Sequence, residues 1–131
     1  MARLLMPRSK ATALLQERID KPPSIVPARR VTGWVLFLRE SEEKEWRDHN
    51  RVLLQKMFTT SEFADQYDES VGAIRPVQDR YMDEFDQIRA RLCYSIRTQV
   101  ACLSSIKNQL EQIDQDSGSD WALAKRPTIN P

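Results

Sequence analysis

The amino-acid sequence predicts an all-α protein, a three-helix module with a long third helix and extended tails at both ends. Only three of the 131 residues are glycine, which is too few for the tight turns of a β-sandwich or barrel. Apolar residues recur at steps of three and four, the spacing that places side chains on one face of a helix. A chain of this length builds one small domain, because two separate cores would each bury too little apolar surface.

The first helix is expected to begin near Thr32, a residue type that caps helix starts, and to end at about His49. Residues 20–27 precede it and contain three prolines, so we expect an extended connector there. Residues 52–58 either lengthen this helix or form a turn of their own. Apolar side chains at i, i+3 and i+4 of the first turns should face the core. These side chains are Trp34, Phe37 and Leu38.

The second helix is expected to follow residues 59–62, because Thr59 and Glu62 have the spacing of a capping box. An apolar stripe at steps of four, four and three marks its buried face. The stripe consists of Phe63, Tyr67, Val71 and Ile74.

The third helix has the strongest pattern. Pro76 suits its first turn, and neither glycine nor proline interrupts residues 77–115, so the helix could be continuous over roughly 60 Å. Because that length exceeds a small domain, we expect its second half to bind a partner as a coiled coil or on a larger assembly. In the alternative interpretation, a break near Ser95 folds the second half back onto the earlier helices. The residues expected to bind the partner are Leu103, Ile106, Leu110 and Ile113.

Charge divides the chain unevenly. Residues 1–39 carry a net charge of +6 and residues 40–91 carry −5, although the whole chain carries only +1. We therefore divide it into a basic extended arm (1–27), a helical domain (28–115) and a C-terminal tail (116–131). A basic arm beside an acidic body is typical of contact with nucleic acid or an acidic protein surface, and a solvated tail is the alternative. Trp121 is expected to anchor the C-terminal tail in a partner's pocket.

The N-terminus has the composition of a mitochondrial targeting segment. Arg3, Arg8 and Lys10 precede the first acidic residue, Glu17. Pro7 interrupts a continuous amphipathic helix there. We expect a mitochondrial location, with a nuclear or cytoplasmic one as the alternative.

Residue types needed for catalysis are sparse. His49 is the single histidine, and Cys93 and Cys102, about 13 Å apart on opposite faces of one helix, read as reduced thiols. We expect no metal site, no cofactor and no enzymatic activity. No apolar run approaches the roughly 18 residues of a membrane span, so none is expected.

Residues 29–39, RRVTGWVLFLR, resemble the entry into the first helix of a high-mobility-group (HMG) box, the three-helix module that binds the DNA minor groove. The resemblance covers about residues 28–95. It places Glu62 to Ile74 on the family's second helix, and Pro76 and Tyr81 on its third. It implies that Val35 occupies the position of the wedge that unstacks a base step, beside Thr32. The family's helices are rich in lysine, whereas residues 40–91 are acidic.

Two kinds of function are compatible with these features. The sequence favours a non-enzymatic structural subunit of a mitochondrial ribonucleoprotein assembly such as the mitochondrial ribosome, with the arm on RNA and the helices on other protein subunits. The alternatives are an HMG-box-like DNA-binding architectural protein and a helical protein-protein scaffold subunit of a mitochondrial or cytoskeletal complex. The residues expected to contact RNA or DNA are Arg18, Lys21, Arg29, Arg30, Thr32, Val35 and Arg39.

Overall fold

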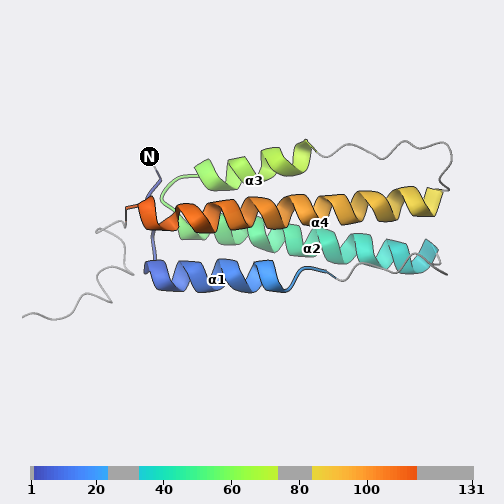
Figure 1. The fold of residues 1–131 in the computed structure, drawn as a ribbon, viewed down its shortest axis with the longest axis horizontal. Helices are drawn as coiled ribbons and strands as arrows, with labels where there is room; N and C mark the ends of the chain where they lie inside the picture. Colours follow the sequence, from blue (N-terminus) through green and yellow to red (C-terminus); the bar gives the residue numbers. More distant parts are fainter. Residues whose placement is uncertain (1, 24–32, 74–83, 115–131) are drawn as a thin grey trace, which may run out of the picture.

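The computed structural model describes residues 2–23, 33–73 and 84–114, and within α2 the side chains from residue 37 onward. These ranges contain α1 (Arg8–Asp20), α2 (Gly33–Met57), α3 (Glu62–Gly72) and α4 (Glu84–Gln109), followed by a 3-10 turn at Leu110–Gln112 (Figure 1). The predicted all-α class and the long C-terminal helix are confirmed.

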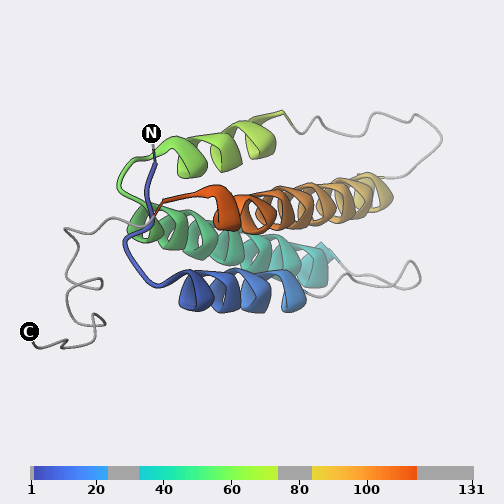
Figure 2. The same ribbon diagram turned by 60° about the vertical axis from the view of Figure 1, so that its left-hand side comes forward.

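The four helices form an up-down-up-down bundle. Figures 1 and 2 show α1 and α3 running in one direction and α2 and α4 in the other, with one end of each helix at a common base. The helices α2 and α4 have 25 and 26 residues, whereas α1 and α3 have 13 and 11. At about 1.5 Å per residue, the long pair extends about 20 Å beyond the end of the short helices. We call this extension, residues 33–45 of α2 and 84–95 of α4, the free end.

Helix α1 corrects the expectation of an extended arm over residues 1–27. Pro7 stands immediately before the first helical residue, a position where a proline starts a helix instead of breaking one. Ala11 and Leu15, one turn apart, are fully buried against the rest of the core. This small apolar stripe holds residues 8–20 in a helix, because an isolated helix of 13 residues is marginal without packing.

The N-terminal residues close the base of the bundle. Leu4 is fully buried and forms an antiparallel bridge with Phe58. The Leu4 amide donates to the Asp114 carbonyl at 2.8 Å, so the N-terminal segment joins the end of α2 to the segment after α4. The Arg8 guanidinium donates to the carbonyl oxygens of Leu110 (2.9 Å) and Ile113 (2.7 Å). The Leu110 carbonyl also accepts from the Ile113 amide at 3.2 Å, so Arg8 adds charged donors at the C-terminal end of the helical segment.

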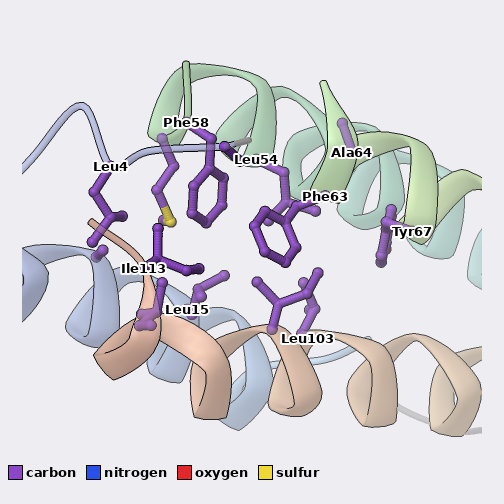
Figure 3. Close-up of a cluster of buried hydrophobic side chains, with 14 of the residues drawn as sticks. Leu4, Leu15, Leu54, Phe58, Phe63, Ala64, Tyr67, Leu103 and Ile113 are labelled. Atoms are coloured by element: carbon purple, nitrogen blue, oxygen red, sulfur yellow. The ribbon is translucent and has the colours of Figure 1, made fainter. Parts of the chain in front are cut away.

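The C-terminal half of α4 and the residues after it lie inside the chain's own core. The predicted partner-binding side chains are buried, with Leu103 and Ile106 at 0% exposure, Leu110 at 1% and Ile113 at 9%. The ring centroids of Phe58 and Phe63 lie 4.5 Å apart, and Figure 3 shows these rings on the opposite side of the interior from Leu103. The partner-binding assignment is therefore wrong for these four residues, because α1, α2 and α3 already cover them. The helix is continuous through Ser95, so no break is needed.

The start of α2 agrees with the prediction, whereas its expected core face does not. The helix begins at Gly33 and continues through residues 52–57, which settles the alternative in favour of an extension. Phe37 is 69% exposed and Leu38 is 41% exposed, so the expectation that they face the core is wrong. Neither α1 nor α3 reaches this part of α2. The side chain of Trp34 lies outside those that the structure describes.

Helix α3 begins at Glu62, as the sequence predicts, without the expected capping box. The Thr59 hydroxyl accepts a hydrogen bond from the Arg3 amide at 2.9 Å instead of capping α3. Phe63 and Tyr67 of the predicted stripe are buried, and Val71 packs against the core.

Candidate functional site

Buried polar side chains connect all four helices through a chain of hydrogen bonds. Arg18 Nε of α1 donates to Asn50 Oδ1 of α2 at 2.6 Å. Asn50 Nδ2 donates to the Tyr67 hydroxyl of α3 at 3.1 Å, and that hydroxyl donates to Gln99 Oε1 of α4. Gln99 Nε2 donates to Glu43 Oε1 of α2 at 2.6 Å. We call this series the polar chain.

The polar chain runs in one direction, from a guanidinium to a carboxylate. Each intermediate group accepts from one neighbour and donates to the next, so the bonds polarise one another in a low-dielectric interior. Desolvation by burial raises the pKa of Tyr67 well above its ordinary value. Its hydroxyl therefore stays protonated and can donate throughout the physiological pH range.

Glu43 is the last residue of the polar chain and lies on the free end. Its side chain is only 7% exposed. The Ser95 hydroxyl at 3.0 Å, the Gln99 amide and the Arg47 guanidinium at 3.6 Å all approach the same carboxylate oxygen, Oε1. The other oxygen, Oε2, has no partner among the described residues. Glu43 also lines a cavity, so this carboxylate is a position where an external donor could bind.

A cavity of about 370 Å³ lies beside Glu43, where α3 ends and α2 and α4 continue. Its apolar lining comes from Phe37, Val71 and Leu92, one from each of α2, α3 and α4. Polar and charged side chains complete the wall. They are Glu40, Ser41, Glu43, Lys44, Arg47, Arg91 and Ser95.

The charges around this cavity leave one cation without an opposite charge. Arg91 pairs with Glu40 at 3.3 Å, and Arg47 approaches Glu43. Lys44 is exposed and forms no ion pair with any described residue. The rim of the cavity is therefore net positive.

Large exposed apolar side chains gather at the free end. Among the described residues, five large hydrophobic side chains are exposed, and four of them lie on the free end. These four are Phe37, Leu38, Phe85 and Tyr94, with exposures between 41% and 69%. Val52, on α2 nearer the base, is the fifth. Nine residues separate Phe85 and Tyr94, which puts them on opposite faces of α4, so the exposed side chains lie on more than one face of the free end.

The structure assigns other roles to the described residues that we expected to contact nucleic acid. Arg18 is part of the polar chain and also donates to the Trp46 carbonyl. Arg39 pairs with Glu42 at 2.8 Å, and its Nε is buried without a hydrogen-bond partner. Lys21 is exposed.

Several predicted site residues lie outside what the structure describes. The side chain of Val35 is one of them, and Trp121 in the C-terminal tail is another. The remaining ones are Arg29, Arg30 and Thr32.

One feature of the α4 sequence indicates a buried polar side chain. Gln99 lies between Ile96 and Leu103 at steps of three and four, so it occupies the buried stripe of α4. A polar residue on a core face needs internal partners. Its partners on α2 and α3 come from distant parts of the chain, and sequence spacing does not identify them.

No group that could hold a metal ion, meaning three or more His, Cys, Asp and Glu side chains, occurs within residues 2–23, 33–73 and 84–114. Cys93 and Cys102 are both free thiols, as the sequence predicts, and burial raises the pKa of the Cys102 thiol. None of the helices in these ranges combines the length and the apolar character needed to cross a membrane.

Comparisons with known proteins found no match for this chain. No protein-family model matches the chain, and neither a curated protein nor a solved structure matches it. The resemblance to the HMG box stays a prediction, since Thr32, Pro76 and Tyr81 also lie outside the described residues. The fold defines the chain as an all-α bundle with exposed apolar side chains at its free end.

Proposed function

We propose that the chain is a non-enzymatic structural subunit that binds other proteins of a larger assembly through its free end. One observation carries this proposal, the gathering of exposed Phe37, Leu38, Phe85 and Tyr94 where α1 and α3 do not cover α2 and α4. The base of the bundle is already closed by residues 2–6 and by the buried half of α4. The free end is thus the part of the described surface best suited to a partner.

RNA contact is the second part of the proposal, with a mitochondrial ribonucleoprotein as the assembly. The basic character of residues 1–39 supports it. Arg8 and Arg18 make bonds within the chain, so phosphate contact rests on Lys21 together with Arg29 and Arg30. The affinity of the isolated protein for structured RNA and for duplex DNA, measured across a salt series, tests this part. An affinity that does not fall with rising salt would remove its physical basis.

Protein docking is tested by the size of the complex that the chain enters in extracts of its own cells. We expect the tagged wild type to elute far above its own 15.3 kDa. A triple variant, Phe37→Ser, Phe85→Ser and Tyr94→Ser, should elute alone, because it removes three of the four large exposed apolar side chains of the free end and leaves the buried core unchanged. Its circular dichroism spectrum should match that of the wild type.

Val52→Ser is the matched control, since Val52 is an exposed apolar residue of α2 outside the free end. It should remain in the large complex. A wild type that elutes as a lone monomer, or a triple variant that stays in the complex, would contradict the docking proposal.

A further inference from the structure

Helix α3 packs against both α2 and α4, and the cavity beside Glu43 lies at its C-terminal end. We call this cavity, together with the faces of α2 and α4 next to it, the groove. Helix α3 lies along α2 and α4 and ends at Gly72, while both long helices continue toward the free end (Figures 1 and 2). Val71, in the last turn of α3, lines the cavity at this junction, and Phe37 and Leu92 line it from α2 and α4. Within the described residues, the length of about 20 Å that neither α1 nor α3 covers corresponds to a helix of three to four turns.

An ion pair between α2 and α3 indicates what kind of helix suits this groove. Helix α3, EFADQYDESVG, has four acidic residues and no basic one, and its Asp68 pairs with Arg51 of α2 at 3.2 Å. Lys44 stands seven residues before Arg51, two helical turns away on the same face of α2. Arg51 thus pairs with a carboxylate of α3, whereas Lys44 places a positive charge where α3 has ended.

We propose that the groove of the free end binds an acidic amphipathic helix of a partner protein, placed as a continuation of α3. The apolar stripe of this helix packs on Phe37, Val71 and Leu92, and one of its carboxylates faces Lys44. An uncharged donor in the stripe, such as a glutamine amide, reaches Oε2 of Glu43. This inference rests on the proposed docking function and specifies the class of partner.

The experiment uses the full-length chain and a synthetic fluorescent peptide of fourteen residues. The peptide is helical, with leucines and one central glutamine on one face and glutamates on both flanks. A second peptide carries lysines in place of the glutamates. Fluorescence anisotropy should show the acidic peptide binding about tenfold more tightly than the basic one.

Two variants locate the binding. Lys44→Glu should weaken the acidic peptide about fivefold and strengthen the basic peptide, since it reverses a rim charge that pairs with no described residue. Phe37→Ser should weaken both peptides about tenfold, because it removes an apolar wall of the groove. Lys56→Glu and Val52→Ser, exposed on α2 outside the groove, are the matched controls and should change either affinity less than twofold.

Equal affinity for the two peptides, or an unchanged affinity in Lys44→Glu, would overturn the proposal. A wild type that dimerises at micromolar concentration and becomes monomeric with Phe37→Ser would assign the groove to a second copy of the chain, which also overturns it. Binding that appears only when residues 74–83 are replaced by glycine and serine would assign the groove to the chain itself. If no peptide binds while the triple variant still leaves its cellular complex, only the acidic helix is refuted and the docking function stands.

Discussion

Replacing Tyr67 with phenylalanine tests whether the polar chain stabilises the bundle. The Tyr67 side chain is fully buried, and its hydroxyl both accepts from Asn50 and donates to Gln99. Phenylalanine keeps the ring and removes only the hydroxyl. Asn50 Nδ2 then loses its acceptor and Gln99 Oε1 loses its donor, both at side chains with 0% exposure.

The expected loss of stability follows from these two orphaned groups. A buried polar group left without a partner costs about 1 to 3 kcal/mol, so two of them should lower the free energy of unfolding by about 2 to 6 kcal/mol. A domain of this size has about 5 to 15 kcal/mol in total. The loss is therefore large enough to measure easily.

Urea unfolding at pH 7, followed by circular dichroism at 222 nm, measures the difference. Tyr94→Phe is the matched control, because it removes the same hydroxyl from a tyrosine of α4 that is 57% exposed. The control should lie within about 0.5 kcal/mol of the wild type. If Tyr67→Phe loses no more than this control, the polar chain contributes no net stability and our reasoning about it is refuted.

Four other changes have defined outcomes. Leu103→Ala should lower the free energy of unfolding of the isolated monomer by about 2 to 5 kcal/mol in the same urea assay, because Leu103 is fully buried, whereas a partner-binding residue would leave the monomer unchanged. Deletion of residues 2–20 should abolish cooperative thermal unfolding, since it removes buried side chains of the core. Cys93 should react with a thiol reagent in the folded protein before Cys102 does, because Cys102 is more buried and its pKa is raised, and equal rates would contradict this. The raised pKa of Tyr67 should make the wild type lose stability as pH rises above about 10, where the unfolded phenol ionises and the folded one does not, and Tyr67→Phe should lack this part of the pH dependence.

Local spacing predicted most of the helices. The step pattern of Phe63 and Tyr67, and that of Leu103 and Ile106, correctly identified buried faces of α3 and α4. The same spacing argument did not predict α1, because we interpreted the basic composition of residues 1–27 as an extended arm. The buried residues Ala11 and Leu15 lie one helical turn apart within that arm. Leu14 and Ile19 also pack partly against the core, and such a short apolar face holds a helix only where a core is present to receive it.

The candidate site was harder to predict than the fold. Phe37 has the spacing of a core residue, yet it is exposed and lines the cavity of the free end. Glu43 and Gln99 are distant in sequence, so their contact depends on how α2 and α4 align. The spacing of residues within one helix does not specify how two helices align.

The sequence by itself determined the helical class, the start of α3 and the buried stripe of α4, because these follow from interactions between residues three and four apart. Only the tertiary structure decided which apolar faces are covered. Coverage depends on the relative lengths and positions of separate helices, and α1 and α3 are too short to reach the free end. For this reason Leu103 is covered by the chain's own helices, where we expected a partner, and Phe37 is exposed, where we expected a core position.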